Sequence, residues 1–285
     1  MSEMSALHRI TDDPGSLAPP SMSSAILRRR DGAVVAAQVE LAAEVPIAFE
    51  YNGVSHAVML ATPSDLSDFA LGFSLSEGVI ASPADCYGIE AHKEPDGITL
   101  AIEIAAAAFM GLKVRRRTLV GRTGCGICGT ESLAQVLRPL PDLKNVALKI
   151  EAGVLARAHA ALPAHQPLQA ATGATHGAVW CRPDGDIVLA REDVGRHNAL
   201  DKLIGALSVA KIDAQQGFIF VTSRASIEMV QKTASAGVAM LVAISAPTAL
   251  GVEVARKSGM TLIGFARGAE FSIYSHPQRI SNPER

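Results

Sequence analysis

Residues 218–265 read FIFVTSRASIEMVQKTASAGVAMLVAISAPTALGVEVARKSGMTLIGF, and this stretch decides the fold of the larger part of the chain. Its apolar runs at 218–221, 238–244 and 260–265 predict three buried strands. The two segments between those runs have the composition and spacing of helices, and Gly237 follows the first of them. A β-α-β-α-β order predicts parallel strands, right-handed crossovers and helices on both faces of the sheet.

Ligands of such sheets bind at the carboxyl ends of the strands. Here those ends are residues 222–226, 245–248 and 266–268. The middle strand lies in an uncharged stretch, residues 233–252, that has the length of a membrane span. Ser245, Pro247 and Gly251 within it suit a buried strand followed by a loop, so we expect no membrane partner.

The chain preceding this stretch predicts a second, smaller unit. Residues 45–60 contain two strand-like runs joined by Asn52-Gly53, the usual pair in a type I′ hairpin turn. Thr62 and Pro63 predict the start of a helix that ends at Gly78, with Thr62 as its cap. Residues 98–104 predict another strand.

Prolines 139 and 141 indicate a boundary between the two units. We therefore divide the chain into an α+β subdomain (residues 26–140) that ends in a Cys-x-x-Cys loop, and an α/β domain (residues 141–285). Residues 1–25 are rich in Ser, Pro and Asp and predict a disordered tail with no signal peptide. In the larger domain, residues 151–162 predict a helix, and residues 177–181 and 187–191 predict a hairpin that turns at Pro183-Asp184-Gly185.

Composition limits the function. The 285 residues are 48% hydrophobic and 19% charged, with a net charge of −2, which is typical of a globular protein. The near-neutral balance argues against a nucleic-acid partner, so an anion site must be local. Four cysteines in a chain of this length do not form a disulfide framework, which favours a reducing, cytoplasmic location.

The most reactive candidate is the loop at residues 121–130, GRTGCGICGT, which contains Cys125 and Cys128. A basic run at residues 113–117 precedes it, and nearby cations favour the reactive thiolate. A structural zinc site needs four ligands, and the chain has only one such pair. A thioredoxin-like pair would open a helix after a strand, which fits this loop poorly. A sulfur carrier needs one nucleophilic thiolate, which the second thiol can assist.

Two further segments are dense in polar side chains. Residues 172–177 and 192–198 bring His176, Arg196 and His197, which suit proton transfer and phosphate binding. Alternatively, Glu192 and Asp193 cap a helix, and Arg196 and His197 are ordinary paired or surface residues. Ser223, Arg224 and Ser226 at a helix start suit a phosphate, and a simple N-cap explains the same pattern.

Together these segments resemble the formate dehydrogenase accessory sulfurtransferase (FdhD) family. The matching stretches occur in one order and cover most of the chain after residue 40; they are residues 69–80, 122–129, 172–177, 192–202, 223–232 and 264–274.

The resemblance implies a fold, a function and a set of partners. The larger domain would have a cytidine deaminase-like αβα fold, and two copies would form a homodimer. A cysteine desulfurase would load sulfur onto Cys125 as a persulfide, with Cys128 as its partner. The substrate that receives this sulfur would be the molybdenum bis(molybdopterin guanine dinucleotide) cofactor destined for the formate dehydrogenase catalytic subunit, with no tightly bound metal in the chain itself.

The resemblance also implies where the guanine nucleotide moiety of the cofactor binds. Ser223 and Arg224 would contribute, together with the family's cofactor-contacting stretch, which maps to Phe265, Ala266, Arg267, Gly268, Ala269 and Glu270. The last position of that stretch is usually Arg in the family. Glu270 replaces that positive charge with a negative one, so a charge contact to the anionic nucleotide is absent there.

Two other functions remain open. A zinc deaminase would share the fold, but it needs His-x-Glu and Pro-Cys-x-x-Cys, and here Gly124 precedes Cys125. A non-catalytic chaperone would bind the cofactor or the apo-enzyme without using the cysteines. Zinc content tests the first alternative, and the activity of a Cys125→Ala variant tests the second.

Overall fold

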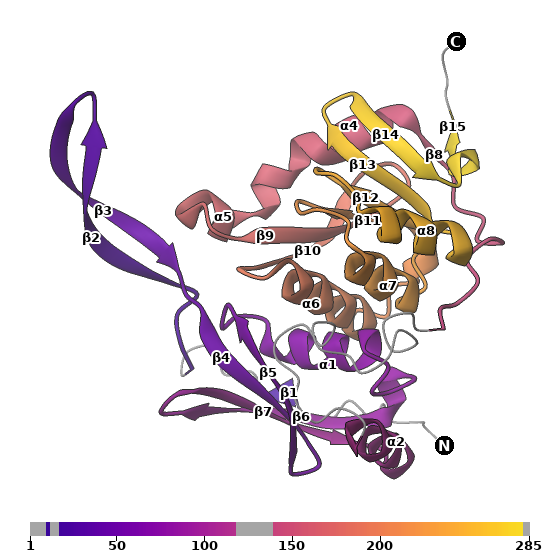
Figure 1. Cartoon of the computed structure of the whole chain (residues 1–285), viewed down its shortest axis with the longest axis horizontal. Coiled ribbons are helices and arrows are strands. Elements are labelled where there is room, and N and C mark those ends of the chain that lie inside the picture. Colours follow the sequence, from indigo (N-terminus) through magenta and orange to yellow (C-terminus); the bar gives the residue numbers. More distant parts are fainter. Residues whose placement is uncertain (1–9, 12–16, 118–138, 282–285) are drawn as a thin grey trace.

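The computed structural model describes residues 10–11, 17–117 and 139–281. Two α/β units lie one against the other, each with its own sheet (Figure 1). The N-terminal sheet has five strands in the order β1-β6-β7-β4-β5, and the C-terminal sheet has six in the order β10-β9-β11-β12-β13-β14. The mixed α/β fold that the sequence predicts is confirmed.

In its described residues, the N-terminal unit consists of strands, two α-helices and one 3-10 helix. They are β1 (Ile10–Thr11), β2 (Ser21–Arg30), β3 (Ala33–Ala42), β4 (Val45–Tyr51), β5 (Val54–Ala61), α1 (Leu66–Ser76), η1 (Pro83–Asp85), β6 (Cys86–Glu94), β7 (Gly97–Ile104) and α2 (Ala106–Arg117).

The C-terminal unit follows the predicted alternation of strands and helices. Its elements are β8 (Ile150–Glu151), α4 (Ala152–Ala161), η2 (Leu162–His165), α5 (Pro167–Thr172), β9 (His176–Cys181), β10 (Ile187–Asp193), α6 (Arg196–Val209), η3 (Ala214–Gln216), β11 (Phe218–Val221), α7 (Ile227–Ser235), β12 (Met240–Ala243), α8 (Ala249–Ser258), β13 (Thr261–Arg267), β14 (Glu270–Ser275), η4 (Pro277–Arg279) and β15 (Ile280–Ser281).

The stretch at 218–265 forms the predicted parallel core. β11 pairs with β12, and β12 with β13, all in parallel. Side chains of β11 alternate between two cores: Ile219 and Val221 pack with α6 and α7, whereas Phe218 and Phe220 pack with α4. Because successive residues of a strand point to opposite faces, helices cover both faces of this sheet.

Both predicted hairpins are present. Asn52 and Gly53 have φ of 46° and 78° between β4 and β5, as a type I′ turn requires. β9 and β10 pair antiparallel around a turn in which Gly185 has a φ of 94°. The uncharged stretch at 233–252 is divided among the end of α7, β12 and the start of α8. No helix in the described part of the chain is long and apolar enough to cross a membrane.

Helix α1 begins three residues later than the sequence predicts. Its first residue is Leu66, and Asp65 precedes it in the left-handed conformation with a φ of 52°. Thr62 does not cap this helix, because its groups are used elsewhere. Its N–H donates to Asp193 Oδ2 (3.0 Å), and its hydroxyl accepts from the Val194 N–H (3.2 Å). A tertiary contact therefore displaces the predicted local cap.

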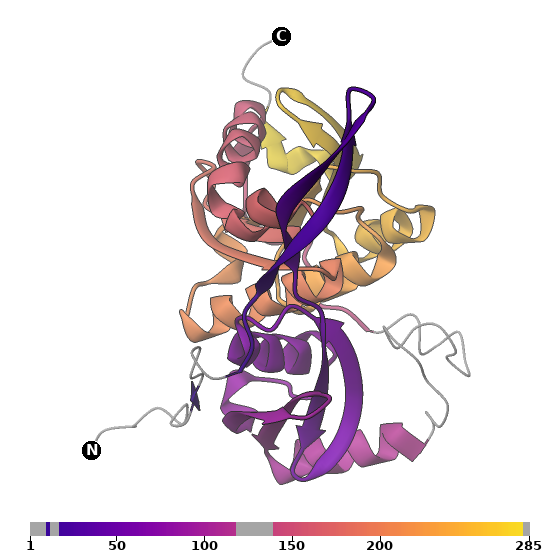
Figure 2. The same ribbon diagram turned by 90° about the vertical axis from the view of Figure 1, so that its left-hand side faces the viewer.

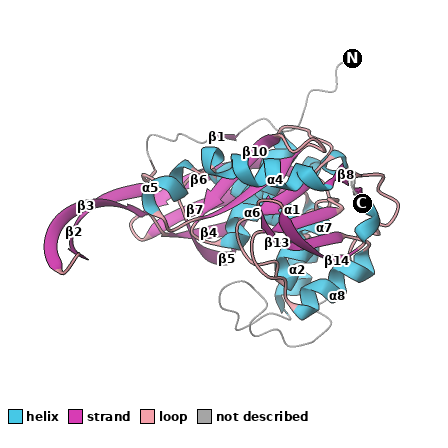
Figure 3. Cartoon of the chain, turned by 90° about the horizontal axis from the view of Figure 1, so that it is seen from above, coloured by secondary structure: helices cyan, strands magenta, loops and turns pink. Residues whose placement is uncertain are grey.

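The ordered chain also starts earlier than the predicted boundary near Ile26. β1 pairs with β6, and β2 begins at Ser21 within the predicted tail. β2 and β3, of ten residues each, form a hairpin that projects from the body of the protein (Figures 1 and 3).

Helices α1 and α6 join the two units (Figure 2). They cross closely because each has a glycine at the contact. A Cβ on Gly72 would clash with the Asp201 backbone, and one on Gly205 would clash with the Asp68 backbone. This close crossing brings polar side chains of α1 near those of α6 and α7.

Candidate functional site

Loops after β11, β12 and β13 meet at one edge of the C-terminal sheet, as the sequence predicts. The Ala225 N–H donates to Ala246 O (3.3 Å), and the Thr248 N–H donates to Ala225 O (3.1 Å). The Phe265 N–H donates to Ser245 O at 3.2 Å. We call this edge, formed by residues 222–226, 245–248 and 265–270, the strand-end edge.

Ser223 and Arg224 lie on this edge with different exposure. Ser223 is buried, and its hydroxyl donates to Arg224 O at 3.1 Å. Arg224 is exposed, so its guanidinium is open to an anion. Ser226 occupies the N-cap position of α7, as one of the two sequence interpretations predicts, but its side chain makes no capping hydrogen bond.

The proposed cofactor stretch, residues 265–270, forms the end of β13, a tight turn and the first residue of β14. Phe265 has a φ of 55° and is exposed, and Arg267 Nε donates to Ile244 O at 3.3 Å. Nothing lies within 4 Å of where a Cβ would stand on Gly268, which has a φ of 58°. This turn therefore offers open backbone beside an exposed cation.

Two residues of the stretch, Ala266 and Glu270, do not offer a side chain that favours an anion. Ala266 is buried in the core of the sheet, so only its backbone faces the edge. Glu270 is exposed and pairs in register with Arg267 across the hairpin. His159 of α4 also reaches the turn, where its Nδ1 accepts from the Gly268 N–H at 3.4 Å. Sequence reasoning missed His159, because nothing in the pattern of α4 distinguishes it from other helix residues.

His176, Arg196 and His197 lie at the same edge. β9 runs antiparallel to β11, so its first residue, His176, stands beside the end of β11. Asp193 at the end of β10 pairs with His176, and Arg196 and His197 follow at the start of α6. The antiparallel pairing of β9 with β11 therefore adds these residues to the strand-end edge, a placement that the sequence analysis did not predict.

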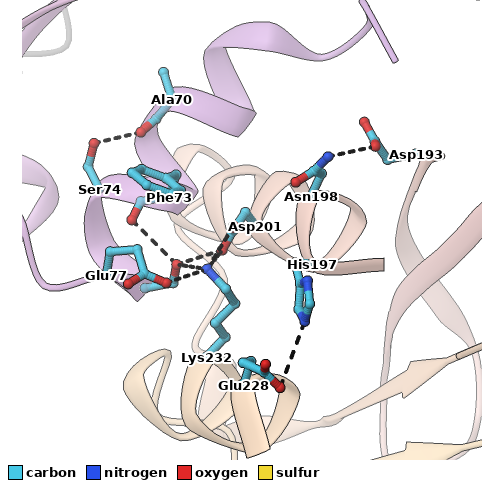
Figure 4. Close-up of polar contacts among 11 residues, drawn as sticks. Ala70, Phe73, Ser74, Glu77, Asp193, His197, Asn198, Asp201, Glu228 and Lys232 are labelled. Carbon is cyan, nitrogen blue, oxygen red and sulfur yellow. Dashed lines mark hydrogen bonds and ion pairs between the residues drawn. The ribbon is translucent and has the colours of Figure 1, made fainter. Parts of the chain in front are cut away.

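The electrostatics favour a neutral His197. Its Nε2 lies 3.9 Å from Glu228 Oε2 on α7 (Figure 4). Burial is the main cause that lowers the pKa of His197, to about 4, and the charges of Arg196 and Lys232 act in the same direction. Burial also lowers the pKa of His176, again with Arg196. Neutral imidazoles with lowered pKa values are weak bases, which disfavours the proton-transfer role for His197.

This burial predicts a pH dependence of stability. The unfolded imidazole titrates near 6.5 and the folded one near 4. Between these values the unfolded chain binds more protons, so stability falls as pH falls from 6.5 towards 4, by at most about 1.4 kcal/mol per pH unit. His197→Gln is expected to flatten that slope in urea titrations across this range. The exposed control His92→Gln should leave the slope of stability against pH unchanged. An unaltered slope in His197→Gln would show that His197 does not cause this pH dependence.

Glu192 acts as a helix cap, which was the alternative interpretation for it. Its carboxylate accepts from the Leu168 N–H (2.9 Å) and the Gln169 N–H (2.7 Å) at the start of α5, and from the Thr175 hydroxyl (3.0 Å). All of these partners are structural, so Glu192 orders α5 and is not free to bind a ligand.

Asp193 lies in a buried ion pair. Its Oδ2 is 2.7 Å from Lys202 Nζ, and both side chains are fully buried. Its Oδ1 accepts from the Gly195 N–H (2.8 Å) and from Asn198 Nδ2 (2.9 Å). Lys202 also donates to Thr62 O at 2.9 Å. Asp193 therefore fixes the loop before α6 and ties it to the N-terminal unit.

A second buried ionic cluster joins α1, α6 and α7 (Figure 4). Lys232 Nζ lies 2.8 Å from Asp201 Oδ2 and 2.7 Å from Glu77 Oε1, and it also contacts Ser76 Oγ at 3.1 Å. Burial alone would lower the pKa of Lys232, but Asp201 and Glu77 outweigh it and raise that pKa. Three of the stretches that carry the family resemblance meet in this cluster.

Cys125 and Cys128 lie outside the described residues. The other two cysteines, Cys86 and Cys181, are free thiols buried in the two cores. Burial raises the pKa of Cys86 to about 11 and that of Cys181 to about 12. Because the thiolate is the nucleophile, neither buried cysteine is reactive near neutral pH. Among the described residues, no three His, Cys, Asp or Glu side chains are grouped to hold a metal.

Comparison with known proteins agrees with the sequence resemblance. The family model FdhD/NarQ matches residues 42–281. The chain is 55% identical over 242 residues to "Sulfur carrier protein FdhD" of Variovorax paradoxus (strain S110), covering 85% of this chain and 86% of that protein. It is 53% identical over 270 residues to the protein of the same name from Cupriavidus necator, covering 94% and 93%.

A solved structure supports the fold. A Desulfotalea psychrophila protein assigned as a formate dehydrogenase accessory protein superposes with a TM-score of 0.71. The match covers 92% of this chain and 100% of that one, at 23% sequence identity. With a family model that spans both units and relatives more than half identical, the chain belongs to the FdhD/NarQ family.

Proposed function

We propose that the chain is a sulfurtransferase that carries sulfur as a persulfide on Cys125. The observation that supports this most is that two of the four cysteines are buried and unreactive. Cys86 and Cys181 are buried thiols with raised pKa values, so sulfur chemistry falls to Cys125 and Cys128. The relatives named as sulfur carrier proteins support the same role.

The two thiols carry out the transfer, and an external reductant completes the cycle. The Cys125 thiolate attacks the outer sulfur of a cysteine desulfurase persulfide, and the desulfurase cysteine leaves as a thiolate. Cys128 then attacks the inner sulfur of the Cys125 persulfide. This forms a Cys125–Cys128 disulfide and releases sulfide, the two thiol sulfurs supplying the two electrons. A reductant of the dithiol class resets the pair.

The proposed acceptor is the molybdenum bis(molybdopterin guanine dinucleotide) cofactor, bound as a substrate on its way to the formate dehydrogenase catalytic subunit. The guanine nucleotide would lie on the strand-end edge. Exposed Arg224 and Arg267 offer cations for the diphosphate, and the open Gly268 backbone offers close approach. The setting proposed for this reaction is the cytoplasm, and the proposed assembly is a homodimer.

Arg267→Ala is expected to weaken GDP binding by about tenfold or more, because a charged hydrogen bond contributes about 1.5–3 kcal/mol. Glu270→Arg should strengthen it by removing repulsion. Isothermal titration calorimetry with GDP measures both. The control Arg182→Ala removes an exposed cation beyond the opposite end of β9 and should leave the affinity unchanged. Equal affinities of Arg267→Ala and the wild type would remove Arg267 from the site.

Transfer itself is tested with sulfur-labelled protein. The loaded chain is mixed with apo formate dehydrogenase and its cofactor, and the label in the enzyme is counted alongside formate oxidation. We expect both to rise together. Full formate oxidation with an unlabelled Cys125→Ala variant would favour the non-catalytic chaperone instead.

A further inference from the structure

The hairpin of β2 and β3, residues 21–42, is an arm that packs mainly against itself, and α5 of the body contacts β3. It projects sideways from the junction of the two units (Figures 1 and 3), and its only extensive packing is between its own strands. An isolated two-stranded ribbon is marginally stable in water at best. The arm therefore needs a surface to cover it.

One face of the arm is apolar along most of its length. Directly paired residues share a face and successive residues alternate, so the register of β2 and β3 assigns each side chain. One face combines seven apolar residues, Met22, Ile26, Ala33, Val35, Ala37, Val39 and Leu41, with Ser24 and, towards the tip, Arg28 and Arg30. Met22 is 59% exposed and Leu41 48% exposed, and Ile26, Ala37 and Val39 between them are half-buried. The base half of the other face is more polar, with Ser23, Gln38 and Glu40, whereas its tip half has Leu27, Val34 and Ala36.

The tip and the base of the arm are complementary. The tip has Arg28, Arg29 and Arg30 together with Leu27, which is 77% exposed. At the base, a hollow of about 400 Å³ is lined mainly by apolar atoms of Pro20, Pro167, Leu168 and Ala171, with Asp65 and Arg191.

The base has an excess of negative charge. Arg191 is paired with both Asp68 (2.6 Å) and Asp65 (3.4 Å), so two carboxylates surround one guanidinium. The capping carboxylate of Glu192 lines the same hollow. A basic tip with an exposed leucine thus matches an acidic rim around an apolar hollow.

We propose that the arm binds a second copy of this chain, with the two arms antiparallel about a two-fold axis and each tip seated at the partner's base. Such an interface is isologous: one patch on each copy covers the same patch on the other. The tip and base of a single arm are a full strand length apart, so the tip cannot reach its own base.

The face of the arm is too small to form a stable interface without the tip. A ten-residue ribbon is about 34 Å long and about 10 Å wide, so one face covers roughly 350 Å². A stable interface buries roughly 800 Å² on each partner. Face-to-face contact of the arms is therefore insufficient alone, and the tips must add contact with the partner's body.

The proposal rests on the homodimer proposed above and not on the sulfur chemistry. Sedimentation is compared for the wild type, Ile26→Glu/Val39→Glu on the apolar face, and Ala25→Glu/Gln38→Glu on the other face. Both variants add two negative charges, one on β2 and one on β3, and the positions used in the control are each one residue away from those used on the apolar face. We expect a wild-type dimer, a dissociation constant at least 100-fold higher for the apolar-face variant, and less than a threefold change for the control.

Cross-linking tests the orientation without disturbing the face. Ala37 lies near the middle of the arm, so the two-fold axis would bring it close to the partner's Ala37. In a Cys125→Ser/Cys128→Ser background, Ala37→Cys should form a disulfide-linked dimer on oxidation, whereas Gln38→Cys on the other face should not. A monomeric wild type, an unaffected dimer in the apolar-face variant, or equal cross-linking at both positions would overturn the proposal. Sulfur loading of the two charge variants, whose loop cysteines are intact, reports separately on the proposed function.

Discussion

Asp193→Ala is expected to destabilise the folded protein by about 3–5 kcal/mol, because it leaves the ammonium of Lys202 buried without its counter-charge. Both side chains are fully buried, and Nζ lies 2.7 Å from Oδ2. The same substitution removes acceptors from the Thr62 N–H, the Gly195 N–H and Asn198. It therefore loosens the contact between the two units as well as the loop before α6.

Urea unfolding measures this loss. The matched control is Glu253→Ala, which breaks a 2.6 Å pair with Lys257 on the exposed surface of α8. Exposed pairs of this kind contribute less than about 1 kcal/mol. The double variant Asp193→Leu/Lys202→Met should be more stable than Asp193→Ala, since it leaves no unpaired charge. A loss below about 1 kcal/mol in Asp193→Ala would show that the buried pair does not hold the units together.

Cys125→Ala is expected to abolish formate dehydrogenase maturation while leaving the fold intact. The substitution removes the proposed nucleophile, and Cys86 and Cys181 cannot replace it because burial holds their thiols protonated. Cys128→Ala should retain part of the activity, since an external thiol can release the sulfur in its place. Cys86→Ala, a buried control, should keep activity in the protein that remains folded.

Formate oxidation by enzyme matured with each variant measures this difference. Circular dichroism confirms that the variants are folded. If Cys125→Ala supported wild-type maturation and Cys128→Ala did not, the two cysteines would exchange roles. If both supported it, the chain would act without sulfur transfer.

Local patterns predicted the parts of the fold that depend on local physics. The apolar runs of β11, β12 and β13 and the turn residues Asn52 and Gly53 appear where the sequence placed them. The strand-end edge was also predictable, because the topology of a parallel sheet brings its loops together. Ser223, Arg224 and Arg267 accordingly lie on one edge.

Long-range ion pairs were not predictable. Lys232 is separated by 31 residues from Asp201 and by 155 from Glu77, and a lysine in a helix is normally exposed. No spacing in the sequence indicates that the glycine-mediated crossing of α1 and α6 buries these charges. The failed cap at Thr62 has the same cause, since its groups bond Asp193 from across the chain. The early start of β2 was missed because its Ser-rich composition is typical of a tail.

The central claim, a persulfide on Cys125, is tested most directly by mass. The purified protein is incubated with a cysteine desulfurase and cysteine, and its intact mass and peptides are then measured without reductant. The proposal predicts a gain of one sulfur on the peptide that contains Cys125, absent in Cys125→Ala and retained at least in part in Cys128→Ala. Loading that survives in Cys125→Ala and disappears in Cys128→Ala, or no gain of sulfur on either peptide, would contradict it.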